Sequence, residues 1–236
     1  MPFMHTPAAS EGGLSYGTDE NLKSRFERDV TTRPTVYVVD DDESMRMGLA
    51  GLLGAAGYRV EAFDSALGFL ALPSRRPGCV VLDLLMPELT GAELQQRLLL
   101  GDDPLPVVFL SGGGDVPAAV EAMKAGAVDF LRKPVDGDAL LRAVERAVAR
   151  DRAAQAARLE RERLNARLAR LTAREQEVLH EVVQGLLNKQ VGARLGITER
   201  TVKRHRGMVM HKLEVASMAE LVRFADRVVD DGTARA

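Results

Sequence analysis

Acidic, hydroxyl and amine side chains follow four separate apolar runs of this 236-residue sequence, at the point where each run ends. The Asp40–Asp42 run comes directly after the first apolar run, and Asp83 ends the third. Ser111 ends the fourth run, and Lys133 follows the fifth. Clustered carboxylates repel one another unless a cation neutralises them, and oxygen ligands in an open, hydrated site suit Mg²⁺. Together with the amine and the hydroxyl, these carboxylates are equipped to hold a phosphoryl group.

The elements that must bring these groups together are alternating strands and helices. The five apolar runs predict strands near residues 36–39, 58–62, 79–82, 106–110 and 127–131. Helical patterns follow these runs, near residues 43–56, 65–72, 91–100, 115–125 and 138–150. The alternation predicts an α/β fold, a doubly wound five-stranded parallel sheet with helices on both faces. The first, third and fourth runs are apolar at almost every position, which predicts that they form central strands.

A common position at one sheet edge would turn the scattered polar groups into one site. The carboxyl ends of parallel strands open on the same edge, where ligands bind in folds of this kind. Taken alone, the Asp40–Asp42 run could simply cap the following helix, and a lone Ser or Lys at a strand end means little. Four such groups at four strand ends favour a shared site that binds magnesium and a phosphoryl group.

The C-terminal part of the chain is predicted to be all helical. Residues 138–171 are rich in Ala, Arg and Glu and contain no Gly or Pro, which favours one long charged helix. Leu164, Leu168 and Leu171 lie at helical spacing, so they either form a short seam with a partner or belong to a lone linker helix. Shorter helices follow, with these predicted caps and stops: a Thr172–Glu175 capping box, Gly185, Asn188, Gly196, Thr198 and Ser217.

Charge and composition narrow the possible partners and compartment. The chain carries a formal net charge of -2, yet Lys and Arg outnumber Asp and Glu between Thr172 and Leu213, which points to a nucleic-acid partner for this part alone. The single Cys79 excludes an intrachain disulfide and fits a reducing compartment. No apolar stretch reaches about 18 residues, and the N-terminus lacks a signal-peptide pattern. We therefore expect a cytoplasmic protein without a membrane partner.

The N-terminal motifs resemble the receiver domain of two-component response regulators. The motifs are Val38-Val39-Asp40-Asp41-Asp42, Asp83-Leu84-Leu85-Met86-Pro87, Ser111-Gly112 and Lys133-Pro134. The segment from Gly114 to Ala127, followed by Asp129-Phe130, is similar to the FixJ-type subgroup. The resemblance covers about residues 35–150 and is specific as a set.

This resemblance implies a role for each group at the predicted sheet edge. Asp83 would accept a phosphoryl group from the histidine of a sensor kinase. Asp41, Asp83 and the Leu85 backbone carbonyl would ligate Mg²⁺, and Asp40 would act through water. Lys133 would pair with the phosphoryl oxygens. The Ser111 hydroxyl would move toward the phosphoryl group while Phe130 turns inward behind it, because two new negative charges attract a donor across the site.

Two residues depart from the pattern of the receiver family. Leu85 stands where related receivers often carry a longer polar residue, and Gly113 replaces a His that is common in the FixJ-like subgroup. Both positions would flank the phosphoryl group and its attacking water. We therefore hypothesise an altered rate of phosphoryl hydrolysis.

The C-terminal motifs resemble a LuxR-type helix-turn-helix over about residues 168–228. They are Leu171 to Leu179, Gly185 to Val191, Ile197 to Arg206, Lys212-Leu213 and Ser217 to Val222. Val202, Val209 and Leu213 mark one apolar face of the predicted recognition helix, and basic residues crowd the rest. Lys203 and Arg204 are expected on base edges, and the resemblance implies phosphate contacts from Asn188, Lys189, Thr201 and His205. Thr198 and Arg200 complete the predicted DNA-binding set.

Both resemblances together predict a response regulator that acts as a transcription factor. The predicted domains are a disordered leader (1–33), a receiver (34–150), a helical linker (151–167) and a LuxR-type DNA-binding domain (168–230). Phosphorylation of Asp83 would promote homodimers that bind paired half-sites on promoter DNA. The expected partners are a sensor histidine kinase and double-stranded DNA, with RNA polymerase as a further candidate. Beyond self-directed phosphoryl transfer and loss at Asp83, we expect no enzymatic activity.

Three other functions agree less well with the sequence. A regulator controlled by a protein partner or ligand, without phosphorylation, disagrees with the intact acidic site. A phosphatase of the haloacid dehalogenase type would need a second Asp two residues after Asp83, where Leu85 stands. An RNA-binding module disagrees with the helix-turn-helix pattern.

Overall fold

The structure, a computed structural model, describes residues 33–74, 76–101, 104–113 and 116–233. Its contacts divide the chain into an N-terminal unit that ends at Asp151 and a C-terminal unit that begins at Arg152. Helix α6, Gly137–Leu168, contributes residues to both units. The predicted leader, residues 1–33, lies outside the described residues except for Arg33.

The N-terminal unit is built on five parallel strands in the order β2-β1-β3-β4-β5. The strands are β1 (Thr35–Val39), β2 (Arg59–Phe63), β3 (Gly78–Asp83), β4 (Val107–Ser111) and β5 (Asp129–Arg132). Strands β1, β3 and β4 are buried at every position, whereas the two edge strands are mostly half-buried. The predicted doubly wound sheet and its three central strands are therefore confirmed, with boundaries shifted by one or two residues.

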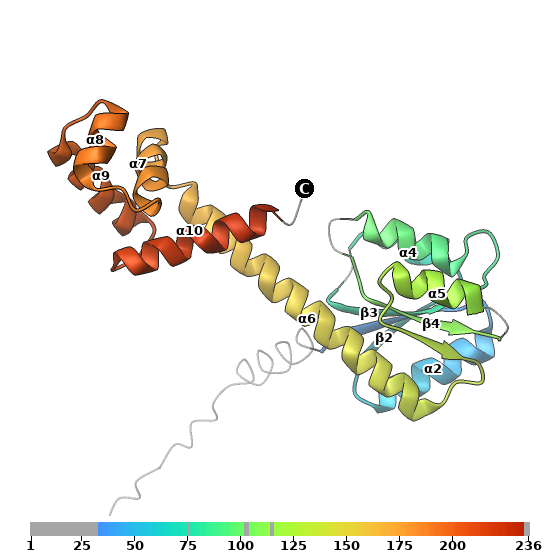
Figure 1. Ribbon diagram of the computed structural model, residues 1–236. Helices are drawn as coiled ribbons and strands as arrows, with labels where there is room; N and C mark the ends of the chain where they lie inside the picture. Colours follow the sequence, from blue (N-terminus) through green and yellow to red (C-terminus); the bar gives the residue numbers. More distant parts are fainter. Residues whose placement is uncertain (1–32, 75, 102–103, 114–115, 234–236) are drawn as a thin grey trace, which may run out of the picture. The chain divides into compact units, whose positions relative to one another are not determined.

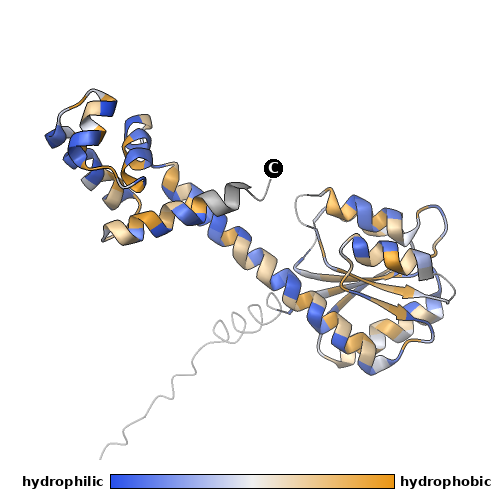
Figure 2. Cartoon of the chain, viewed as in Figure 1, coloured by the Kyte–Doolittle hydropathy of each residue, from blue (hydrophilic) through white to orange (hydrophobic). Residues whose placement is uncertain are grey.

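Helices cover both faces of this sheet, as Figure 1 shows for the N-terminal unit. One core packs α2 (Glu43–Ala55) and the start of α6 against one face, around Leu53, Val81 and Leu140. A second core packs the helices of the other face around Tyr37, Phe69 and Phe109; these are α3 (Ala66–Leu70), α4 (Gly91–Leu99) and α5 (Val116–Lys124). The hydrophobic strands between helices of mixed hydropathy are visible in Figure 2. Burial of apolar surface on both faces stabilises the parallel sheet.

A buried carboxylate anchors α6 at the beginning of β3. Asp151 is 3% exposed, and its Oδ2 accepts a hydrogen bond of 2.8 Å from the backbone N–H of Gly78. A β-carbon at residue 78 would lie 1.7 Å from the backbone oxygen of Thr35. Only glycine allows the two strands to approach so closely at this position.

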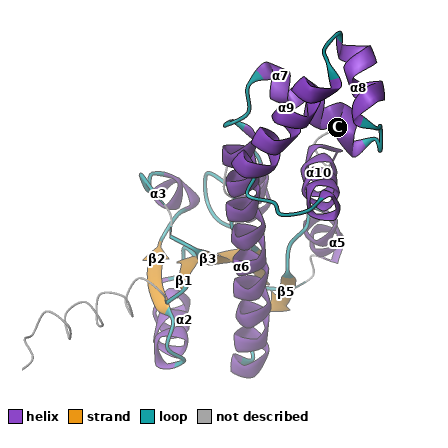
Figure 3. Ribbon diagram, turned by 90° about the vertical axis from the view of Figure 1, so that its left-hand side faces the viewer, coloured by secondary structure: helices purple, strands orange, loops and turns teal. Residues whose placement is uncertain are grey.

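The described part of the C-terminal unit consists of helices and loops (Figure 3). The end of α6 is joined by α7 (Ala173–Val183), α8 (Asn188–Leu195), α9 (Glu199–Lys212) and α10 (Met218–Thr233). Their shared core includes Leu164, Val178, Val202 and Leu221. Leu164 and Leu171 of the predicted leucine seam are therefore buried within this unit.

Most of the predicted caps of these helices are confirmed. Thr172 and Glu175 form the reciprocal capping box, and the Thr198 and Ser217 hydroxyls accept from the backbone N–H groups three residues later. Gly196 ends α8 with φ +67°. The prediction that Asn188 caps α8 is wrong, because Leu187 is the N-cap residue and Asn188 is the first residue of the helix. The Gln190 side chain instead accepts from the Leu187 N–H at 2.8 Å.

Among the described residues, no helix is both long and apolar enough to cross a membrane.

Replacing Gly78 by Ala tests the close approach of β1 and β3. We expect Gly78→Ala to lower the free energy of unfolding by about 3 kcal/mol, because the new methyl group forces the strands apart. Gly51→Ala is the matched control: residue 51 lies within α2 with open space around its missing side chain. It should raise the free energy of unfolding by about 0.5–1 kcal/mol. Urea denaturation followed by circular dichroism measures both; equal effects would contradict the packing described here.

Candidate functional site

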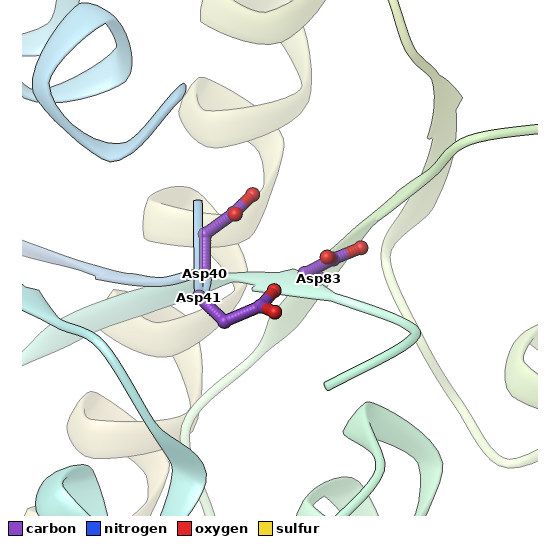
Figure 4. A group of neighbouring side chains, drawn as sticks. All are labelled: Asp40, Asp41 and Asp83. Carbon is purple, nitrogen blue, oxygen red and sulfur yellow. The ribbon is translucent and has the colours of Figure 1, made fainter. Parts of the chain in front are cut away.

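Three aspartates meet at the carboxyl edge of the sheet, at the ends of β1 and β3. Asp40, Asp41 and Asp83 each offer a carboxylate oxygen, and these oxygens lie within 4.8 Å of one another. Figure 4 shows the three side chains projecting from these adjacent strand ends. Asp40 and Asp83 are buried, whereas Asp41 is exposed. The predicted convergence of carboxylates from two strands is thus present in the fold.

The aspartates of the Asp40–Asp42 run have different structural roles, some in the carboxylate cluster and one at the start of the next helix. Asp42 is the N-cap of α2, and its Oδ1 accepts from the Met45 N–H at 2.8 Å. Asp40 Oδ1 accepts from the Asp42 N–H at 2.9 Å, which orients the Asp40 carboxylate. Within this run, Asp42 therefore caps α2, whereas Asp40 and Asp41 belong to the cluster of carboxylates.

Lys133 joins the two buried carboxylates. Its Nζ donates to Asp40 Oδ2 at 2.7 Å and lies 3.1 Å from Asp83 Oδ2. The side chain reaches the site from the end of β5, where the Lys133 N–H donates to the Ser111 carbonyl at 2.7 Å and the Lys133–Pro134 peptide is cis. One ammonium thus partly neutralises two carboxylates that would otherwise repel each other.

Burial and this ion pair set the protonation of the site. Burial raises the pKa of Asp83, and the charge of Asp40 adds to that rise. The hydrogen bond and charge of Lys133, and the Leu85 N–H, act in the opposite direction. Burial by itself would lower the pKa of Lys133, but its hydrogen bonds to Asp40 and Asp83 outweigh burial and raise it. Ionised Asp83 therefore costs folding stability, which declines as the pH rises through the raised pKa of Asp83.

The remaining predicted residues of the site lie on β4, on β5 and after β3. Ser111 is 1% exposed, and its Oγ accepts from the Gly113 N–H at 3.4 Å. The Phe130 ring is half-buried, with its centroid 6.3 Å from that of Phe109. The Leu85 side chain is 61% exposed. Of the FixJ-like motif, Gly114 and Asp115 lie outside the described residues.

Sequence reasoning missed two side-chain-to-backbone contacts of this unit, one at the site and one between α4 and α5. Arg46 of α2 donates from Nη1 to the Asp40 carbonyl at 2.7 Å. Gln95 of α4 is buried, and its Nε2 lies 3.4 Å from the carbonyl oxygens of Ala122 and Ala125, near the end of α5. A polar residue among the apolar positions of α4 was the only available signal for the second contact.

The basic surface of the C-terminal unit lies on α9 and the start of α8. Five of the predicted DNA-binding side chains are exposed: Lys189, Thr198, Arg200, Lys203 and Arg204. Asn188, Thr201 and His205 are half-buried. The Val202 and Val209 side chains hold the opposite face of α9 in the core. Asn188 also accepts a 3.4 Å hydrogen bond from Arg206, which links α8 to α9.

A buried ion pair supports the position of α9. Lys212 Nζ donates to Glu175 Oε2 at 2.6 Å, and Glu175 is 4% exposed. The hydrogen bond from Lys212 and those from Thr172 lower the pKa of Glu175. The glutamate of the α7 capping box therefore also holds the end of α9.

Comparison with known proteins matches both parts of the chain. The profile of the response regulator receiver domain matches residues 36–145, and that of the bacterial regulatory proteins of the luxR family matches residues 169–225. The transcriptional regulatory protein FixJ of Bradyrhizobium diazoefficiens is 43% identical over 84% of this chain and 97% of its own length. The response regulator protein TodT of Pseudomonas putida is 41% identical, with 83% and 86% covered.

Solved structures agree with these sequence matches. The response regulator StyR superimposes with a TM-score of 0.75 at 47% identity, covering 83% of this chain and all of StyR. Full-length FixJ from B. japonicum gives a TM-score of 0.52 at 43% identity, with 84% and 98% covered.

The bridging role of Lys133 is tested by replacing it with Met. We expect Lys133→Met to raise the pKa of Asp83 further, because the ammonium that opposes the effect of burial is lost. NMR titration of the side-chain carboxyl groups, without divalent metal, measures this pKa. Lys124→Met is the control, since Lys124 is exposed on α5 and forms an ion pair with Glu121 of the same helix at 2.8 Å. An unchanged pKa of Asp83 in Lys133→Met would show that the ion pair does not exist in solution.

Proposed function

This chain belongs to the response regulators with a LuxR-type DNA-binding domain, which are transcription factors, and we propose that phosphorylation of Asp83 controls its binding to DNA. The observation that carries the proposal is the buried Asp83 carboxylate, which lies 3.1 Å from Lys133 and beside Asp40 and Asp41. The exposed basic residues of α9 support the second part of the proposal, the binding of DNA.

The proposed chemistry is a transfer of a phosphoryl group from the phosphohistidine of a sensor kinase. An Asp83 carboxylate oxygen forms a bond to phosphorus while the phosphorus–nitrogen bond of the donor breaks, and the histidine keeps that electron pair. Lys133 pairs with the phosphoryl oxygens as negative charge concentrates there. Hydrolysis later returns Asp83 to a carboxylate and releases phosphate. The protein acts only on its own Asp83, so it turns over no separate substrate.

Mg²⁺ fits the three carboxylates of this edge. Three negative groups face one ammonium, and oxygen ligands of this kind suit Mg²⁺. We assign Asp41, Asp83 and the Leu85 carbonyl as ligands, with Asp40 acting through water. Bound there, the ion would offset the charge that the carboxylates and the incoming phosphoryl group share.

The signal would then pass from the site to the surface of the receiver. The phosphoryl group attracts the Ser111 hydroxyl, and Phe130 turns into the space behind it. Phe130 already packs beside Phe109 at the margin of the core, so its rotation would alter the surface of α5 and β5. We propose that this altered surface favours homodimers.

A dimer would place two basic units on paired half-sites of promoter DNA. Lys203 and Arg204 would contact base edges in the major groove, and Arg200 lies beside them on α9. Asn188, Lys189, Thr198, Thr201 and His205 would contact phosphates and fix the register. RNA polymerase would be the next partner at the promoter. Because its DNA target lies in the cytoplasm, we propose that compartment for the protein.

Footprinting of promoter DNA tests the proposed switch. Acetyl phosphate with Mg²⁺ should extend or strengthen the footprint of the wild type and leave that of Asp83→Ala unchanged. Asp42→Asn is the control, because Asn preserves the cap of α2 while one carboxylate near the site is neutralised. This variant should respond as the wild type does. Identical footprints of wild type and Asp83→Ala under both conditions would favour a regulator controlled by a protein partner or ligand instead.

The proposed base contacts are tested on α9 itself. We expect Lys203→Ala to weaken binding to the specific site by roughly 10- to 100-fold while binding to random DNA falls far less, because a base contact discriminates sequence. Arg223→Ala on α10 removes an equal charge from an exposed position and should change specific binding little. Fluorescence anisotropy at fixed salt measures both. A uniform loss on specific and random DNA would instead assign Lys203 to the phosphate backbone.

A further inference from the structure

A second cation lies at the margin of the phosphoryl-accepting site. Arg132 is the last residue of β5 and pairs in register with Ser111, the last residue of β4. Alternate residues of a strand share a face of the sheet. Arg132 therefore lies on the same face as Phe130, and Ser111 on the same face as Phe109, and those two rings are neighbours. The Arg132 side chain thus begins beside the Ser111 hydroxyl.

The loop after β4 shows where the guanidinium lies. A β-carbon at Gly113 would be 3.1 Å from Arg132 Nε, 3.2 Å from Nη2 and 3.4 Å from Cζ. The guanidinium therefore lies beside Gly113, next to the space that a side chain at this position would need. Gly113 has φ +110°, and its N–H donates to Ser111 Oγ. Gly113, Ser111 and Arg132 form one contiguous group.

The site contains three carboxylates and the single ammonium of Lys133, so a second cation could bind added negative charge. Asp40 and Asp83 share the single ammonium of Lys133, which would also pair with the phosphoryl oxygens. Arg132 is exposed, and its guanidinium has no hydrogen bond or ion pair with any described residue. A phosphoryl group on Asp83 would carry up to two negative charges, where the ionised carboxylate carries one, and would add three acceptor oxygens. The planar fork of an arginine suits phosphoryl oxygens better than the point charge of a lysine does.

We propose that Arg132 is a phosphoryl-binding residue, whose guanidinium donates hydrogen bonds to the phosphoryl group on Asp83 from the side of Ser111 and Gly113. The inference rests on the proposed phosphorylation of Asp83 and deepens it. Neither Leu85 nor Gly113 offers a polar side chain to the phosphoryl group. Arg132 supplies that contact from the neighbouring strand, and the missing side chain of Gly113 makes room for it.

Binding of beryllofluoride, a phosphoryl analogue, to the full-length protein with Mg²⁺ tests this contact. Arg132→Ala should raise the half-saturating concentration roughly tenfold, as expected for the loss of a hydrogen bond to a charged group. Arg132→Lys should recover part of that loss, because it restores the charge without the fork. Arg142→Ala removes the same charge from an exposed position of α6 and should bind as the wild type does.

Kinetics with acetyl phosphate separate phosphoryl binding from a general structural role. Arg132→Ala should raise the acetyl phosphate concentration that gives half-maximal phosphorylation and change the maximal rate much less. Its melting temperature should match that of the wild type, since Arg132 is exposed. Unchanged half-saturation by both acetyl phosphate and beryllofluoride would overturn the inference.

The same measurements distinguish this inference from the proposed function. If the wild type binds beryllofluoride, Asp83→Asn does not, and Arg132→Ala equals the wild type, only the role of Arg132 is wrong. If the wild type itself fails to bind, the phosphorylation of Asp83 is wrong and the role of Arg132 falls with it.

Gly113→His tests the packing that places the guanidinium. A side chain at residue 113 would displace Arg132, so Arg132→Ala should cost less beryllofluoride affinity in the Gly113→His background than in the wild type. Equal losses in both backgrounds would overturn the proposed dependence on Gly113.

Discussion

Two buried carboxylates that share one ammonium are the constraint on which the N-terminal unit depends. Asp40 and Asp83 end neighbouring strands, so the parallel sheet itself forces them together. Lys133 offsets their repulsion only because β5 brings it to the same edge as β1 and β3. Burial raises the pKa of Asp83 in spite of that ammonium. The fold thus keeps a carboxylate buried at the carboxyl edge of the sheet in spite of the cost of removing it from water.

Along each central strand, the side chains that pack the core and those that form the site occupy different positions. The side chains of β1, β3 and β4 fill two cores, and the carboxylates, the hydroxyl and the ammonium of the site lie at or beyond the carboxyl ends of the strands. At the opposite end, Asp151 and Gly78 fix where β3 begins. The loop that carries Asp41 lies between β1 and the N-cap of α2, so regular structure holds it at both ends.

In the C-terminal unit, buried and charged side chains likewise occupy different faces of α9. Val202 and Val209 bury one face of α9, which leaves Lys203 and Arg204 exposed on another. The Thr172–Glu175 capping box also receives Lys212, so the first helix of the motif positions the last turn of its recognition helix. These contacts fix the position of the helix whose basic residues are expected to meet DNA.

The sequence by itself determined the fold class, the three central strands, most helix caps and the group of Asp40, Asp41, Asp83, Ser111 and Lys133. These features follow from local periodicity and from the rule that parallel strands end at one edge, which need no coordinates. Only the tertiary structure decided which aspartate of the run caps α2, that Leu187 rather than Asn188 precedes α8, and that Arg132 lies against Gly113. Each of these outcomes depends on backbone direction and on the space between elements that packing brings together, and neither quantity is encoded in the spacing of residue types.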